Sequence, residues 1–358
     1  MDLVEILKSA VRLGASDIHI VIGKPPMSRI HGEITELPDF GTITAESSKA
    51  LIYSSLYDEQ KAKFEERMEL DCSIHIPDLA RFRVNVLMQK NGVEAVLRVI
   101  SSKIPTPEEL GLTQSMVALS DLPRGLVLVT GPTGAGKSTT LACLINQINQ
   151  KYRKHILTIE DPIEFVYEHK KSIIRQREVG QQTHSFQEAL RHALRQDPDV
   201  ILVGEMRDLE TIALAVTAAE TGHLCFATLH TGDAPQTIDR IIDVFPPHQQ
   251  QQVRIQLANT LQGVISQILL ARKDAKGRIA ARELLITNPA VSNLIREGKT
   301  HMIYNAIETG GKFGMFSMDK SLGDLVRRGL INQEEALSKA HNADAVRSAA
   351  RPASVSIA

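Results

Sequence analysis

Hydrophobic residues along the first hundred positions recur at two spacings, and each spacing predicts a different kind of element. Leu3, Ile6, Leu7 and Val11 follow helical spacing up to Gly14, which predicts a short amphipathic helix. Period-two alternation elsewhere predicts β-strands bounded by turn residues. Such a mixture is typical of a small α+β domain with an antiparallel sheet. We expect strands over 17–22, 27–30, 33–37, 69–76, 80–89 and 93–100, and helices over 44–55 and 58–68.

A different order begins near residue 124, where buried, β-branched runs alternate with helical patterns. This alternation predicts a parallel sheet with helices on its faces, an α/β core of the RecA-like kind. Two further runs, 264–270 and 278–286, flank a polar turn and predict a hairpin at the sheet edge. The parallel strands are expected over 126–130, 155–160, 199–205 and 224–229, with helices beginning near Ser185 and Leu209.

The two patterns imply two domains joined by a proline-rich stretch. Residues 1–100 form the smaller domain, and residues 101–123, with little periodicity, read as a partly ordered linker. Residues 124–341 form the larger domain, which ends in short helices. Residues 342–358 are rich in Ala, Ser and Arg, so we expect a disordered tail.

Composition narrows the class of protein. The 358 residues carry a formal net charge of −1, so no global basic field indicates a nucleic-acid partner. Three widely spaced cysteines favour neither a disulfide framework nor a zinc site. The sequence shows neither a signal-peptide layout nor an apolar run long enough to cross a membrane. We therefore expect a cytoplasmic protein.

The segment after the first parallel strand matches the phosphate-loop pattern G-x-x-x-x-G-K-[ST] at every fixed position. A strand, a glycine-rich loop and a helix in this order aim backbone N–H groups and a positive helix end at one point. We expect ATP there, with Lys137 on its β- and γ-phosphates and the Ser138 hydroxyl on Mg²⁺. The predicted nucleotide-binding residues are Gly131, Pro132, Thr133, Gly134, Ala135, Gly136, Lys137, Ser138 and Thr139.

Polar side chains follow the other parallel strands, whose carboxyl ends face the crevice where a nucleotide binds. The acidic segment Glu160–Glu164 could orient or deprotonate an attacking water. Glu205, after a buried run, could act on Mg²⁺ through its water shell or on the nucleophile. His230 ends the fourth strand and could sense the γ-phosphate or contact a neighbouring subunit. His223 begins that strand, roughly 20 Å away, so we expect an interface or structural role for it.

Arginines line one face of the predicted strand 80–89. Arg81 and Arg83 lie opposite to the apolar positions of this strand, and Arg98 lies on the next strand. One interpretation is a solvated sheet face with guanidinium groups in water. The other is that these arginines face a phosphate site on an adjacent subunit.

These motifs together resemble the ATPases of secretion systems and pili over nearly the whole chain. Within that superfamily the sequence is most similar to type IV pilus retraction ATPases, also called twitching motility proteins. The segment Ala290–Glu297 resembles a retraction motif, with departures at Val291 and Ser292. The cysteine cluster and longer N-terminal region of extension and secretion relatives are absent. The other matching segments are 131–139, 160–164, 203–207, 221–231, 14–19 and 25–27.

The resemblance implies a RecA-like ATPase domain preceded by a smaller α+β (PAS-like) domain. It implies a homohexamer at the inner-membrane base of a pilus, acting on a platform protein and other pilus machinery, with neither zinc nor nucleic acid expected. ATP and Mg²⁺ would be bound as the loop predicts. The implied roles are general base for Glu164, Walker-B glutamate for Glu205, a histidine pair for His223 and His230, and arginines in a neighbour's site for Arg81, Arg83 or Arg98.

Three alternatives stay open at this point. One is a pilus-assembly or type II secretion ATPase of the same superfamily. Another is a RecA-like nucleic-acid translocase, although the chain has no Trp and only 4% aromatic residues to stack on bases. The third is a scaffold that binds nucleotide without hydrolysing it.

Overall fold

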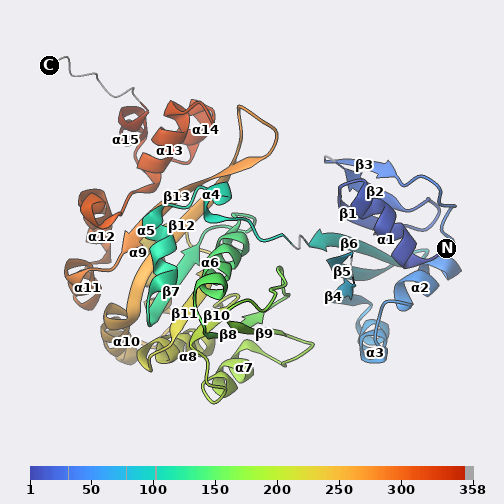
Figure 1. Cartoon of the computed structure of the whole chain (residues 1–358), viewed down its shortest axis with the longest axis horizontal. Coiled ribbons are helices and arrows are strands. Elements are labelled where there is room, and N and C mark those ends of the chain that lie inside the picture. Colours follow the sequence, from blue (N-terminus) through green and yellow to red (C-terminus); the bar gives the residue numbers. More distant parts are fainter. Residues whose placement is uncertain (31, 78, 101–102, 351–358) are drawn as a thin grey trace. The chain divides into compact units, whose positions relative to one another are not determined.

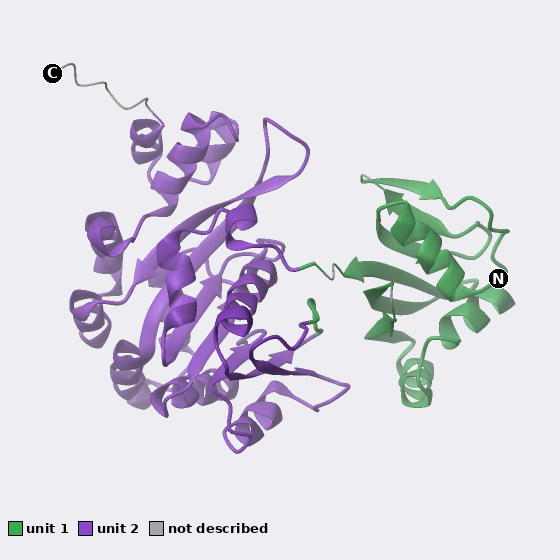
Figure 2. Ribbon diagram, in the orientation of Figure 1, with its two compact units in different colours: residues 1–103, 162–166 green, residues 104–161, 167–358 purple. Residues whose placement is uncertain are grey.

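The computed structural model describes residues 1–30, 32–77, 79–100 and 103–350. Its contacts divide the chain into two compact units, which Figure 2 colours separately. Unit 1 comprises Met1–Lys103 with Pro162–Val166, and unit 2 comprises Ile104–Asp161 with Tyr167–Ala358. The division at residue 103 falls within the stretch that the sequence predicts to be a linker.

Unit 1 is built on a six-stranded antiparallel sheet in the order β3-β2-β1-β6-β5-β4. Side chains from the helices, including Ile6 and Phe64, pack with Phe82 of the sheet in one buried core. On β5, the face opposite the core is mostly polar, as the alternation predicts. The elements are α1 (Leu3–Arg12), β1 (Ala15–Ile20), β2 (Met27–Ile30), β3 (Glu33–Glu36), α2 (Ala45–Tyr53), α3 (Asp58–Arg67), β4 (Glu69–Ile76), β5 (Ala80–Gln89) and β6 (Gly92–Ile100).

Unit 2 contains a seven-stranded sheet in the order β13-β12-β7-β11-β10-β8-β9. Neighbouring strands are parallel except for the β12–β13 hairpin, which lies at one edge as predicted. The central strands are buried on both faces, which explains their continuous apolar runs. The strands are β7 (Gly125–Thr130), β8 (His155–Glu160), β9 (Ile173–Glu178), β10 (Val200–Val203), β11 (Leu224–Leu229), β12 (Leu261–Ala271) and β13 (Arg278–Ile286).

Helices cover both faces of this sheet (Figure 1). Leu126 and Leu128 of β7 point into a core that contains residues of α7 (Phe186–Ala193), α8 (Leu209–Glu220), α9 (Ala234–Asp243) and α10 (Pro247–Thr260). Since strand residues alternate, Val127 and Val129 point to the other face, where α6 (Lys137–Lys151) packs against β7.

Shorter helices complete unit 2. Between the units' boundary and the sheet lie α4 (Pro107–Leu110), α5 (Gln114–Val117) and η1 (Ala118–Asp121), so much of the predicted linker is helical. Beyond the hairpin follow α11 (Pro289–Arg296), η2 (Thr300–Met302), α12 (Ile303–Thr309), η3 (Gly310–Phe313), α13 (Met318–Arg327), α14 (Gln333–Ser338) and α15 (Ala343–Ala349).

Several elements differ from the sequence predictions, which name neither α9 nor α10. The prediction of a disordered tail over 342–358 is wrong for its first residues. Helix α15 forms there and buries Val346 against α13 and its neighbours. Residues 351–358 of that prediction lie outside the described residues. Strand β9 was not predicted at all, because its sequence Ile-Ile-Arg-Gln-Arg-Glu places polar residues on an edge strand.

Candidate functional site

The phosphate loop connects β7 to α6 and packs tightly against the neighbouring strand β12. Gly131 adopts φ 142°, and a Cβ at this position would lie 2.1 Å from the carbonyl oxygen of Gln267. Any other residue would therefore collide with backbone, so this glycine is required by packing as well as by conformation.

Gln267 of β12 holds the loop from beneath. Its Nε2 donates to the carbonyl oxygen of Ala135 at 2.6 Å, and its Oε1 accepts from the Thr140 hydroxyl at 2.8 Å. Only 1% of Gln267 is exposed, so these bonds replace water that the amide has lost. The amide thus fixes the loop to the first turn of α6.

Lys137 is curled back onto its own loop. Its Nζ donates to the carbonyl oxygens of Gly131 at 2.7 Å and Pro132 at 3.1 Å, and lies 3.4 Å from Nδ1 of His230. An ammonium group can only donate, so His230 Nδ1 accepts and its Nε2 carries the proton. The ammonium group of Lys137 therefore lies within the loop. The phosphate oxygens of a bound nucleotide would take the place of the Gly131 and Pro132 carbonyls as its hydrogen-bond acceptors.

His230 also contacts Glu205, so a chain of contacts runs from Lys137 through His230 to Glu205. Oε1 of Glu205 is 2.8 Å from Nε2 of His230 and 2.6 Å from Nε of Arg207, whose Nη2 donates to Oε2 at 2.7 Å. Partial burial alone would raise the pKa of Glu205. The hydrogen bond and charge of Arg207, together with His230, outweigh that effect and hold the pKa below its usual range. Glu205 is therefore a carboxylate at neutral pH.

Gly204 precedes Glu205 and allows the ends of β8, β10 and β11 to approach one another closely. The Gly204 N–H donates to the Ile159 carbonyl at 2.7 Å, and a Cβ here would lie 3.1 Å from the same oxygen. From the other side, the Thr228 hydroxyl donates to the Gly204 carbonyl at 2.5 Å. These bonds join the carboxyl ends of β8, β10 and β11.

The acidic segment after β8 divides between the two units. Glu160 ends β8 and is buried, accepting from the Thr158 hydroxyl at 2.6 Å and from Nε2 of Gln176 at 3.2 Å. Glu164 is exposed and lies in Pro162–Val166, which groups with unit 1. The role of Glu164 as general base stays a prediction.

Within unit 2, His223 is not brought to the cluster of Lys137, His230, Glu205 and Arg207. His223 precedes β11, at the opposite strand end from His230, and its Nδ1 lies 3.0 Å from the Ala218 carbonyl oxygen. Arg81, Arg83 and Arg98 lie in unit 1 on β5 and β6. Their roles stay predictions.

The donor set suits magnesium. Within the described residues, His, Cys, Asp and Glu form no group of three that could hold a metal by themselves. Mg²⁺ commonly keeps several waters and binds one or two protein oxygens together with substrate phosphates. The Ser138 hydroxyl and, through water, the Glu205 carboxylate are oxygen donors of that kind.

Sequence reasoning missed two residues of the site, Arg207 and Gln267. Arg207 follows Glu205 by two positions, and its role depends on a loop geometry that no periodicity predicts. Gln267 carried a usable signal, since an amide within the apolar strand β12 must find hydrogen-bond partners.

The chain is similar to known proteins over most of its length. The family model for type II/IV secretion system proteins matches residues 1–335. The chain is 53% identical over 340 residues to the type IV pilus retractation ATPase PilT of Pseudomonas aeruginosa, covering 95% of this chain and 98% of the relative. It is 51% identical over 321 residues to a twitching motility protein of Neisseria gonorrhoeae, covering 90% and 86%.

A solved structure is also similar over its whole length. The crystal structure of the pilus retraction motor PilT with bound ADP superposes with a TM-score of 0.91 at 49% identity. The match covers 96% of this chain and 98% of that one. The mixed α/β fold and its two-domain arrangement therefore follow a known architecture.

Replacing Gln267 with alanine should destabilise the protein through its phosphate loop. Gln267→Ala leaves the Ala135 carbonyl and the Thr140 hydroxyl without their buried partner, which costs roughly 2–4 kcal/mol of unfolding free energy. Urea unfolding measures this loss. Gln262, on the same strand with a single long bond of 3.5 Å, is the matched control. Equal losses for both alanine variants would contradict the assignment.

Proposed function

The chain belongs to the family of type II/IV secretion system proteins, and we propose that it is a motor whose ATP hydrolysis powers retraction of a type IV pilus. It is an ATPase of the pilus-retraction type, like the relatives that match it over nearly their whole length. The observation that carries the proposal is the contact chain from Lys137 through His230 to Glu205. It joins the phosphate loop to the strand ends where hydrolysis would occur.

ATP has room beside the loop. A cavity of about 550 Å³ is lined by Gly136, Thr139 and Thr140 at the start of α6 and by Leu269 and Arg278 of the hairpin. This volume is typical of small-molecule sites. We place the nucleoside part of ATP in this cavity and its phosphates on the loop.

The residues of the cluster divide the work of phosphoryl transfer. Lys137 would hold the phosphates and offset their charge, while the hydroxyl of Ser138 and, through water, the carboxylate of Glu205 would hold Mg²⁺. Bound Mg²⁺ supplies positive charge against the charge that develops on the transferred phosphoryl group. Glu164 orients or deprotonates the attacking water. His230, between Lys137 and Glu205, changes partners when phosphate draws Lys137 away.

The proposal includes a homohexamer in which arginines of unit 1 act on a neighbour's nucleotide. Arg83 and Arg98 are paired across β5 and β6, which places two like charges directly opposite each other. Asp17 bonds Arg98 at 2.8 Å. No described carboxylate lies within 4 Å of Arg83. Arg83 is therefore the first candidate to meet a phosphate, ahead of Arg98 and Arg81.

The place of action follows from the proposed work. Within the described part of the chain, we find no helix with both the length and the apolar character that a membrane span requires. We propose that the protein works in the cytoplasm, peripheral at the inner-membrane base of a pilus. Its partners there would be a platform protein and the pilus machinery.

Replacing Glu205 should stop hydrolysis and spare nucleotide binding. Glu205→Gln keeps the shape of the side chain but removes its charge, so turnover should fall at least ~100-fold. ATP affinity, measured by calorimetry, should change by less than about fivefold, since Lys137 still holds the phosphates. Chelating Mg²⁺ with EDTA should abolish turnover of the unchanged protein. Undiminished hydrolysis in Glu205→Gln would remove this residue from the mechanism.

The direction of pilus movement has a genetic test. Cells that lack this protein should keep surface pili yet lose twitching, because pili still assemble but do not retract. Electron microscopy counts the pili and a subsurface agar assay measures twitching. Bald cells would contradict retraction and indicate an assembly motor of the same superfamily.

Mixing two inactive variants tests whether Arg83 acts across subunits. Arg83→Ala keeps its phosphate loop, and Lys137→Ala keeps its arginine, so each variant alone should be nearly inactive. In random 1:1 mixed rings, about a quarter of sites combine an intact loop with a neighbour's intact arginine. ATPase activity should recover accordingly. The exposed Arg67→Ala should be fully active alone, and absent recovery would place Arg83 outside the neighbour's site.

A further inference from the structure

A second cavity of about 500 Å³ lies in unit 2, away from the phosphate loop. Its walls come from β13, from the segment before α13, from α13 itself and from the α4–α5 region. It shares five lining residues with the nucleotide cavity described above, but none of the residues 131–140; the shared residues are Gly111, Ala280, Arg282, Leu325 and Arg328. The two cavities are thus neighbours with a common wall.

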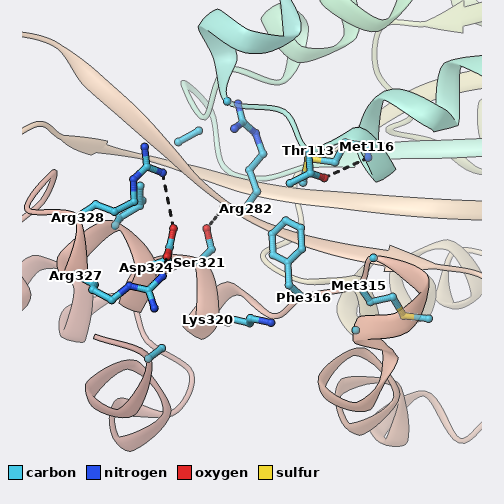
Figure 3. Close-up of a pocket in the computed structure, with 16 residues that line it drawn as sticks. Thr113, Met116, Arg282, Met315, Phe316, Lys320, Ser321, Asp324, Arg327 and Arg328 are labelled. Carbon is cyan, nitrogen blue, oxygen red and sulfur yellow. Dashed lines mark hydrogen bonds and ion pairs between the residues drawn. The ribbon is translucent and has the colours of Figure 1, made fainter. Parts of the chain in front are cut away.

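Positive charge dominates this second cavity. Figure 3 shows Arg282, Lys320, Arg327 and Arg328 around it, with Asp324 as the acidic side chain in the lining. Asp324 pairs with both Arg327 and Arg328. Lys320 has no carboxylate within 4 Å among the described residues. The lining therefore holds more cationic groups than its own carboxylate neutralises.

Arg282 is the unusual member of the set. It is only 6% exposed, and no described carboxylate lies within 4 Å of its guanidinium group. Nη1 donates to the Leu110 carbonyl at 2.8 Å, and Nε lies 3.4 Å from Oε1 of Gln267. Burial lowers the pKa of Arg282 to about 10, which leaves it charged at neutral pH. A buried charge without a counter-ion is costly, and an anion in the cavity would reduce that cost.

An aromatic ring completes the lining. Phe316, just before α13, is half-buried and lies between Arg282 and Lys320 in Figure 3. A flat base can stack on a phenylalanine ring, while phosphate oxygens accept from guanidinium and ammonium groups. The volume is sufficient for a mononucleotide.

We propose that this cavity is a second ligand site, which binds a small phosphorylated molecule with a flat ring, of the nucleotide class. Phosphate contacts Lys320 and the arginines, and the ring lies on Phe316. Because Arg282 also contacts Gln267, which holds the phosphate loop, occupancy of this cavity affects the loop. The site is therefore placed to regulate ATP binding.

The test uses a variant in which nucleotide binding at the phosphate loop is disabled, so that binding at the second cavity can be measured alone. In full-length Lys137→Ala, equilibrium dialysis should still detect binding of ATP, and more weakly of pyrophosphate. Adding Lys320→Glu should weaken binding of both ligands about tenfold, because a cation becomes an anion. Adding Phe316→Ala should weaken ATP binding and leave pyrophosphate unchanged.

Two matched controls locate the binding. Arg278→Ala lies in the nucleotide cavity alone, and Lys339→Glu lies outside both cavities, so neither should change the residual affinity. Circular dichroism verifies that each variant is folded. No binding to Lys137→Ala up to millimolar ligand would overturn the proposal. So would residual binding that Arg278→Ala removes and Lys320→Glu does not.

Discussion

The site depends on the close approach of the phosphate loop to strand β12. The parallel register pairs Thr130 with Ser266, so the next residue of the loop lies against Gln267. Only a residue without Cβ fits there, and the amide of the same glutamine then bonds the loop and α6. One strand neighbour therefore sets both the path of the loop and its rigidity. Preorganised N–H groups of this kind bind phosphate without ordering a flexible loop first.

The second constraint is electrostatic. Lys137 donates to loop carbonyls and to His230, while Arg207 bonds both oxygens of Glu205. The charged side chains of Lys137, Glu205 and Arg207 thus all have hydrogen-bond partners within the protein. In the mechanism proposed above, phosphate would replace the carbonyls at Lys137, and Glu205 would exchange its bonds to Arg207 for contact with water or Mg²⁺. His230 would link these two exchanges in that mechanism, because it contacts both Lys137 and Glu205.

Much of the fold could be predicted because its signals are local. The alternation in β5 and the buried runs of β7, β10 and β11 follow directly from which faces are covered. Strand β9 gave no such signal, because an edge strand pairs through its backbone and tolerates arginine and glutamate side chains. Helix α15 was missed for the opposite reason. Its sequence has few large apolar residues and so gives little helical pattern. The helix is ordered by packing of Val346 against α13 and its neighbours.

The same distinction separates the predicted site residues from the missed ones. Lys137, Glu205 and His230 could be found because each follows a recognisable strand, and parallel strands end at one edge of a sheet. Arg207 bonds Glu205 because the loop turns its side chain back toward that residue. Gln267 bonds Ala135 and Thr140, which lie far earlier in the sequence. The roles of both residues therefore depend on the folded structure. Gln267 shows where sequence reasoning can still improve. A buried amide in an apolar strand must be bonded, and the backbone carbonyls of the loop on the neighbouring strand are where to look for its partners.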